Sequence, residues 1–101
     1  MIARQWRGYA LSEQADAYAA HLSGSVLPQL RSLPGFRGAS LARRNANGEV
    51  ELLVTTRWDS MDAVRAFAGD KPDIAVVEPA ARAVLSRFDA TVDHYEVVLD
   101  V

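Results

Sequence analysis

The sequence predicts an α+β domain of the ferredoxin-like, split-βαβ type, in which a four-stranded antiparallel sheet carries helices on one face. Aliphatic and β-branched runs are typical of strands, and two of them flank Asn45–Gly48, which is typical of a tight hairpin. Apolar residues at helical spacing follow the first and third of these runs. The resulting element order is β-α-β-β-α-α-β, with no internal linker.

The composition is that of one globular domain spanning residues 1–101. A chain of this length buries roughly two-thirds of the surface that its unfolded form exposes. Its content of 50% hydrophobic and 24% charged residues is ordinary for such a domain. The formal net charge of -2 gives no overall support for nucleic-acid binding.

Composition also bears on location and chemistry. No stretch approaches the roughly 20 apolar residues of a membrane span, and Met1–Arg7 lacks the apolar run of a secretory signal. We therefore expect a cytoplasmic protein with no membrane partner. The absence of cysteine excludes disulfides, thiolate metal sites and a cysteine nucleophile.

The first strand is expected from about Ile2 to Tyr9, with Arg4 and Trp6 on the same face. Ser12 is the expected N-cap of the following helix, because its hydroxyl can accept a hydrogen bond from the first turn. Apolar residues at helical spacing support this helix: Ala15, Tyr18, Ala19, Leu22 and Val26.

Two features weaken the second half of this helix. Ser23–Ser25 contains a glycine, which costs about 1 kcal/mol relative to alanine, and Pro28 lacks a backbone donor. We expect a kinked helix, or two segments with Pro28 in the first turn of the second. Pro34 and Gly35 stand in the order of a type II turn and should end the helix.

The second and third strands are expected from about Phe36 to Arg44 and from Glu49 to Trp58, antiparallel to each other. Asp59 and Ser60 carry side-chain oxygens suited to the first turn of a helix, and Gly69 is the expected end of that helix. The strand therefore runs directly into the helix.

The rest of the chain supplies three further elements. The apolar run Ile74–Val77 is expected to pack inward. Pro79 is suited to the first turn of a short helix, Ala80–Leu85. Thr91–Leu99 is the expected fourth strand.

Helices on one face leave the other sheet face uncovered. Leu52 and Val54 lie on one side of the third strand and Leu53 on the other, so neither face is suited to water. We therefore expect a second copy of the chain to cover the open face, giving a homodimer.

Trp58 and Trp6 are candidates for lining a pocket. Trp58 ends the third strand, where a bulky indole is either the wall of a pocket or a core residue. Either role requires an acceptor for a buried indole N–H. Trp6 has the same two readings, with the core reading favoured for a central strand.

His21 and the pair His94 and Tyr95 are candidates for acid–base chemistry. His21 could act as a general base because its pKa lies near working pH, and the alternative is a partly exposed surface residue. His94 and Tyr95 alternate on the last strand, so one of them must point toward the helices. That residue could orient a phenol or quinone oxygen or make a structural hydrogen bond.

Other classes of site have less support. Two histidines far apart in the sequence form no metal-ligand pattern, and we expect no metal. Strand arginines, Arg4 among them, could bind an anionic or phenolate group or form intersubunit salt bridges. Nucleophile-elbow, phosphate-loop and dinucleotide motifs are absent. RNA binding would need aromatic residues on the central strands, and the third strand has none before Trp58.

Three segments carry a resemblance to a known family: Leu33–Gly38 before the second strand, Thr56–Val64 with Phe67, and His94–Val97 in the last strand. With them, the chain resembles the antibiotic biosynthesis monooxygenase superfamily of dimeric α+β barrel proteins. With the element order, the resemblance covers nearly the whole chain. It implies the fold and the homodimer, whereas activity depends on the site.

One branch of that superfamily oxidises aromatic polyketides to quinones with oxygen and no cofactor, using a tryptophan and an asparagine. Trp58 matches the tryptophan. No asparagine lies in the strand cores, because Asn45 and Asn47 belong to the hairpin.

A second branch degrades haem, with an asparagine on the first strand, a tryptophan on the second main helix and a histidine beyond it. Here Phe67 stands at the tryptophan position, Val77 near the histidine position, and the first strand has no asparagine. Haem is therefore the less expected cofactor.

The leading hypothesis is a homodimeric, cofactor-independent monooxygenase acting on a small, electron-rich aromatic. The alternatives are a non-catalytic dimeric module that binds a hydrophobic metabolite and a haem-binding or haem-degrading protein. The predicted catalytic residues are Trp58, His21, His94 and Tyr95. The predicted substrate-binding residues are Trp6, Phe67, Val77 and Arg4.

Overall fold

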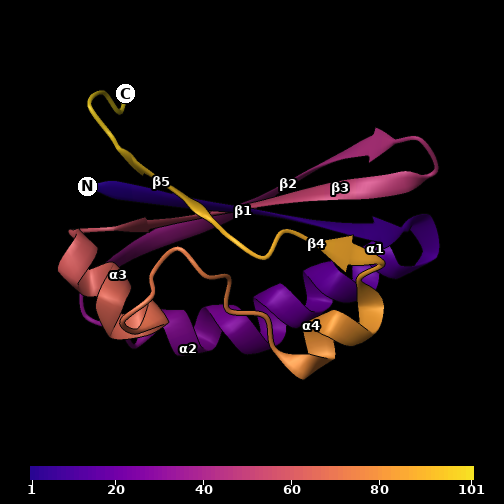
Figure 1. Cartoon of the computed structure of the whole chain (residues 1–101), viewed down its shortest axis with the longest axis horizontal. Helices are drawn as coiled ribbons and strands as arrows, with labels where there is room; N and C mark the ends of the chain where they lie inside the picture. The colour runs from indigo at the N-terminus through magenta and orange to yellow at the C-terminus, as the bar shows by residue number, and fades with distance from the viewer.

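The computed structural model describes the whole chain, residues 1–101. An antiparallel sheet has the strand order β2-β3-β1-β4, and β5 also pairs with β1. The helices cover one face of this sheet (Figure 1). The predicted ferredoxin-like α+β class is therefore confirmed. The elements are β1 (Ile2–Leu11), α1 (Ser12–His21), η1 (Leu22–Val26), α2 (Leu27–Arg31), β2 (Phe36–Ala46), β3 (Glu49–Trp58), α3 (Met61–Ala68), α4 (Pro79–Val84), β4 (Arg87–Phe88) and β5 (Asp93–Glu96).

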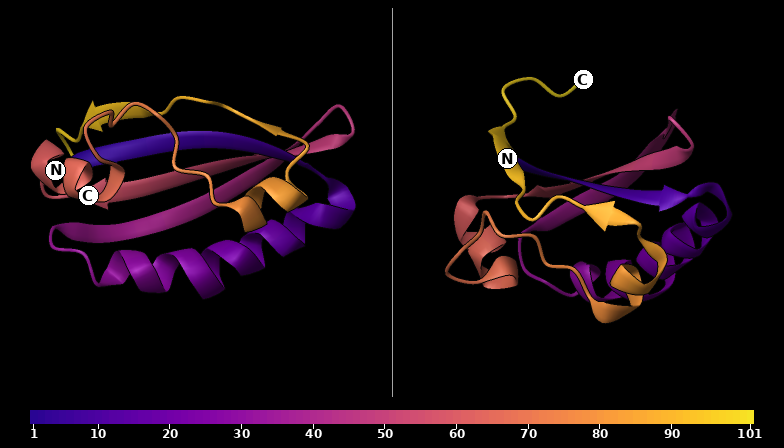
Figure 2. Two further views of the ribbon diagram at one scale, coloured as in Figure 1. Left: turned by 60° about the horizontal axis from the view of Figure 1, so that its bottom comes forward. Right: turned by 45° about the vertical axis from the view of Figure 1, so that its right-hand side comes forward.

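A long helical segment, α1 through η1 to α2, lies along the sheet (Figure 2). The predicted interruption takes the form of a π-helical turn, η1, and Pro28 lies in the first turn of α2. The prediction of Ser12 as N-cap is wrong. Strand β1 continues to Leu11, which takes the cap position without a side-chain hydrogen bond, so Ser12 is already helical.

The two predicted turns are confirmed. Phe36 N–H donates to Leu33 O at 3.3 Å, and Gly35 has the positive φ of 83° that a type II turn requires. At the hairpin, Asn47 and Gly48 have φ values of 53° and 86°, which matches a two-residue type I′ loop.

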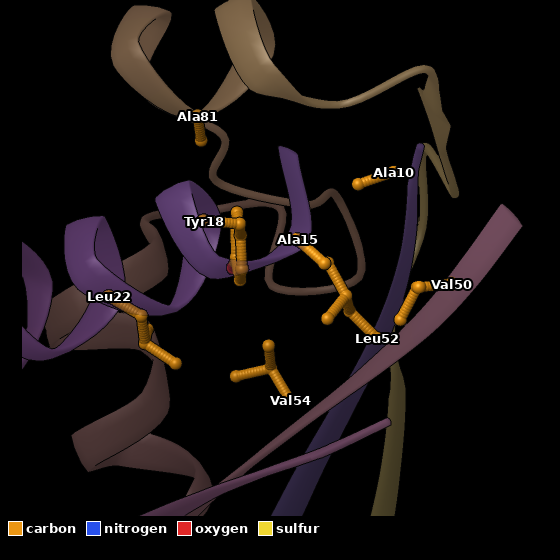
Figure 3. Packing of buried hydrophobic residues seen from close by; sticks show 8 residues of the cluster. All are labelled: Ala10, Ala15, Tyr18, Leu22, Val50, Leu52, Val54 and Ala81. Atoms are coloured by element: carbon orange, nitrogen blue, oxygen red, sulfur yellow. The ribbon is translucent and has the colours of Figure 1, made fainter. Parts of the chain in front are cut away.

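Strand β3 alternates strictly between its two faces. Val50, Leu52, Val54, Thr56 and Trp58 are buried on the helix side. Figure 3 shows Leu52 and Val54 pointing toward the helix residues that complete this core. Helix α3 begins as predicted, because Ser60 Oγ accepts a hydrogen bond from Ala63 N–H at 3.3 Å.

The segment between α3 and α4 packs inward only in part. The prediction that this run packs inward holds for Ala75 and Val77, which are partly buried, whereas Ile74 and Val76 are each about half exposed, at 50% and 53%. Ile74 forms an isolated β-bridge with Thr91. The predicted start of the next helix is close, since α4 begins at Pro79.

The fourth strand differs most from its prediction. Instead of one strand from Thr91 to Leu99, the short strands β4 and β5 both pair with β1. Between them the chain leaves the sheet plane, and the Trp6 indole N–H donates to Asp89 O at 2.8 Å. Val97 N–H donates to Met1 O at 2.9 Å, and beyond it Leu99, the predicted end of the strand, is 77% exposed.

The face of the sheet away from the helices is polar and half-buried. Leu53 lies there, as predicted, but so do the ion pairs of Glu51 with Arg7 at 3.8 Å and with Arg44 at 3.2 Å. None of the helices has the length and apolar character needed to cross a membrane.

Candidate functional site

A cavity of about 100 Å³ lies between the sheet and the helices. Eleven of its 16 lining residues are hydrophobic. The structure brings five of the predicted site residues to this cavity: Arg4, Trp6, His21, Phe67 and Val77.

Regular strand and helix geometry positions these side chains. Arg4 and Trp6 are two residues apart on β1 and therefore share its helix face. Tyr18 and His21 are three residues apart on α1, with ring centroids separated by 6.4 Å.

The lining surface continues along the helical segment through η1. Leu22, Val26 and Leu30 follow one another at four-residue intervals, a spacing that places side chains on one side of a helix, and all three line the cavity.

His21 carries the site's most informative atom. Its Nε2 is the one buried side-chain nitrogen or oxygen in the chain that has no hydrogen-bond partner. Buried polar atoms are nearly always paired. Because His21 is also a lining residue of the cavity, its unpaired nitrogen is suited to a group that reaches it from the cavity.

Tyr18 also lines the cavity. The residue is 5% exposed, and burial raises the pKa of its phenol to about 12. Its hydroxyl is therefore protonated at neutral pH and can donate a hydrogen bond. Trp6 packs against it, with ring centroids 6.1 Å apart.

Arg4 supplies a buried positive charge. It is 5% exposed and lies over the Phe67 ring, with its guanidinium carbon 5.7 Å from the centroid. Burial lowers the pKa of Arg4 and the Asp73 carboxylate opposes this, but a guanidinium stays charged in proteins. The cavity thus combines a mainly apolar wall with one cation, Arg4, and one carboxylate, Glu78.

Three predicted site residues do not line the cavity. Trp58 is fully buried behind it, with its indole N–H donating to Thr56 Oγ1 at 2.9 Å and its ring stacked on Phe67. Trp58 therefore occupies the core position that was the alternative to a pocket wall. Thr56 and Phe67, which contact Trp58, line the cavity in its place.

His94 and Tyr95 point to opposite faces. His94 pairs with Arg4 in the sheet register and contacts it on the helix side, with Nε2 2.9 Å from Arg4 Nη1. Tyr95 pairs with Ala3, lies on the open face and is 54% exposed. The structure thus separates Tyr95 from the cavity, contrary to its predicted place there.

Sequence reasoning missed other lining residues, including Tyr18, Thr56, Gln29 and Glu78. Tyr18 had a usable signal, because it stands one helical turn before His21. Thr56 shares the strand face of Val54 and Trp58. Gln29 and Glu78 had no local signal, since their approach to the cavity depends on how the elements pack. No group of three or more His, Cys, Asp or Glu side chains is arranged to hold a metal.

Comparison of the sequence with known protein families gives a match. A family model described as antibiotic biosynthesis monooxygenase matches residues 1–71. Comparison of the sequence with curated proteins gives no match.

Solved structures resemble the chain over nearly its whole length. SnoaB, a cofactor-independent oxygenase from Streptomyces nogalater, is 13% identical, with 99% of this chain and 96% of SnoaB covered and a TM-score of 0.58. The monooxygenase ActVA-Orf6 of Streptomyces coelicolor, solved with nanaomycin D, is 15% identical, with 99% and 92% covered and a TM-score of 0.62. The haem-degrader MhuD of Mycobacterium tuberculosis, solved with two haems, is 24% identical, with 100% and 99% covered and a TM-score of 0.62.

Proposed function

Because the chain belongs to the antibiotic biosynthesis monooxygenase family, we propose that it is a cofactor-independent monooxygenase that oxidises a small, electron-rich phenol to a quinone. The observation that carries this proposal is that His21 lines a mainly apolar cavity and that its buried Nε2 has no hydrogen-bond partner. Such a nitrogen can accept the proton whose loss makes a phenol reactive toward oxygen.

The size of the cavity limits the substrate to no more than a single aromatic ring. An apolar cavity of about 150 Å³ can take up benzene, and this cavity is somewhat smaller, with about 100 Å³. Larger polycyclic substrates would require the lining segments to move apart.

The polar groups support formation of a phenolate. With its own proton on Nδ1, His21 can take the phenol proton at Nε2. The Arg4 cation and the Tyr18 hydroxyl, which stays protonated, would stabilise the oxyanion in a cavity of low polarity. Such preorganised groups act most strongly where water is excluded.

The anion then gives electrons to oxygen. For a simple phenol, one oxygen atom replaces a ring hydrogen and becomes the second quinone carbonyl. The other oxygen atom leaves as water with the two hydrogens that the phenol loses. The reaction consumes one O₂ per phenol and needs no further reductant.

Haem degradation is the second candidate, favoured because the unpaired His21 Nε2 could ligate iron. The fit is poor in other respects. This cavity of about 100 Å³ is smaller than the roughly 150 Å³ that takes up benzene, so it is too small for a porphyrin. His94, the other histidine, has Nε2 against Arg4. We therefore derive no step through haem.

We also propose a homodimer formed through the open face of the sheet. Support comes from apolar side chains that the chain leaves exposed: Tyr95 on that face is 54% exposed, and Val98 and Leu99 beyond β5 are 88% and 77% exposed. Sedimentation equilibrium should give twice the chain mass of 11.0 kDa. A mass of one chain at all concentrations would contradict this assembly.

Oxygen uptake with a panel of monocyclic phenols, in the presence of a metal chelator, tests the function. We expect one O₂ consumed per phenol, and no saturable haem binding in a parallel titration. Saturable binding of one haem per chain would favour the haem-degrading alternative. Saturable phenol binding with no oxygen uptake would instead indicate the non-catalytic binding module.

A further inference from the structure

A chain of three polar side chains adjoins the cavity and joins three separate parts of the sequence. Asp73 comes from the segment between α3 and α4, His94 from β5, and Arg4 from β1. His94 Nδ1 lies 3.2 Å from Asp73 Oδ1, and His94 Nε2 lies 2.9 Å from Arg4 Nη1.

The donor inventory fixes the protonation state of His94. A guanidinium has only N–H donors, so His94 Nε2 must be the acceptor in its contact with Arg4. The remaining imidazole proton is then on Nδ1, where it can be donated to the Asp73 carboxylate. His94 is therefore neutral, in the Nδ1–H tautomer, whenever this chain of contacts is intact.

Arg4 is held by backbone groups as well. Its Nη1 donates to Pro72 O, and its Nη2 donates to Ile74 O at 3.2 Å. These contacts and the one with His94 use three of the five guanidinium N–H groups. The Nε–H and one Nη2 proton are left, and Arg4 lines the cavity.

We propose that Asp73 and His94 are positioning residues that hold the Arg4 guanidinium so that its two remaining N–H groups bind an anionic phenolate oxygen in the cavity. This inference rests on the proposed function and adds two residues outside the cavity to its site. Removing Asp73 frees His94 to rotate or change tautomer, and Arg4 then loses its side-chain acceptor.

The charges around His94 agree with this role. Burial and the Arg4 cation lower its pKa, whereas Asp73 and its strand neighbour Asp93 oppose that shift. Asp93 is itself 3.9 Å from Arg7 on β1. His94 therefore stays neutral at neutral pH, as acceptance from Arg4 requires.

Imidazole ¹⁵N chemical shifts test the positioning chain without any activity measurement. The chain has only His21 and His94, so two imidazoles need to be resolved. We expect His94 in the neutral Nδ1–H form at neutral pH. We also expect its pKa to rise in Arg4→Met, because a cation that lowers it is removed. An Nε2–H tautomer in the wild type, or an unchanged pKa in Arg4→Met, would overturn the inference.

Binding of 4-nitrophenolate, measured by calorimetry, tests whether the positioned Arg4 binds an anionic oxygen. The pH of the measurement should be well above about 6.5, the ordinary pKa of a histidine side chain. Asp73→Ala should weaken binding about tenfold, because Arg4 is then no longer held for the charge-assisted hydrogen bonds that it donates to the phenolate. Asp70→Ala, at an exposed position in the same segment, is the matched control and should bind like the wild type. The Asp73 side chain is 79% exposed, so its removal should leave the fold intact.

The two proposals fail separately. Equal affinity in the wild type and Asp73→Ala would overturn the positioning role while leaving the phenol site standing. If the wild type binds no 4-nitrophenolate, the phenol site and the anion-binding role of Arg4 are both overturned, whatever the tautomer of His94.

Discussion

The indole N–H of Trp58 donates to the hydroxyl of Thr56 at 2.9 Å, and the two residues occupy the same face of β3. Trp58 is fully buried, whereas Thr56 also lines the cavity. This hydrogen bond therefore joins the core beneath α3 to the wall of the candidate site.

Removing either partner of this hydrogen bond should destabilise the fold. Thr56→Val leaves the buried Trp58 N–H unpaired, which costs about 1–3 kcal/mol of unfolding free energy. Trp58→Phe loses the same bond and also packing volume. In urea unfolding, the double variant should lose less than the sum of the two single losses. Additive losses would show that the bond contributes nothing to stability.

Replacing His21 should lower turnover strongly without lowering stability. His21→Phe removes a buried nitrogen that has no partner, so the unfolding free energy should stay equal or rise by about 1 kcal/mol. Phenol oxidation should fall by at least about 100-fold, the lower end of what a general base contributes. Tyr95→Phe, on the open face, is the control and should retain full turnover. Wild-type turnover in His21→Phe would remove this residue from the chemistry.

The buried Tyr18 phenol should make the protein sensitive to alkali. Its pKa rises from 10.0 to about 12 on folding, so the unfolded chain releases this proton at lower pH than the folded one. Stability should be full below pH 10 and fall by about 2–3 kcal/mol as the pH rises to about 12. Urea unfolding across this range measures the slope. Tyr18→Phe should remove that part of it, and an unchanged slope would contradict the assignment.

Replacing Gly24 and Gly35 with alanine should change the stability of the chain in opposite directions. Gly24 lies in η1 with no atom within 4 Å of an added Cβ, so Gly24→Ala should stabilise the chain by about 0.5–1 kcal/mol. Gly35 has a φ of 83°, and an added Cβ would lie 2.6 Å from Ala63 Cβ. Gly35→Ala should therefore destabilise by more than about 1 kcal/mol. Thermal unfolding of both variants checks the contrast, and equal midpoints would refute it.

Much of the fold could be predicted because its signals are local. Asn47 and Gly48 specify a tight hairpin through their backbone preferences, and Ser60 specifies a helix start through its hydroxyl. The two-residue period of β3 identified its buried face. Strand β4 has only two residues, too few to show any period, and it exists only because β1 offers a partner.

The site was harder to predict because it depends on register and depth. Alternation shows that His94 and Tyr95 face opposite ways, but only the pairing of His94 with Arg4 shows which one faces the helices. Likewise, the sequence puts Trp58 on the correct face of β3. That it is covered by Phe36 and Phe67, 5.3 and 5.4 Å away between ring centroids, follows from tertiary packing alone.

The most direct test of the proposed chemistry is the fate of labelled oxygen. Incubation of the wild-type protein with a monocyclic phenol under ¹⁸O₂ should give a quinone with one labelled oxygen atom, and labelled water as the second product. His21→Phe should give almost no labelled quinone while remaining folded. A quinone without label, or equal labelling in His21→Phe, would contradict oxygen transfer at this cavity.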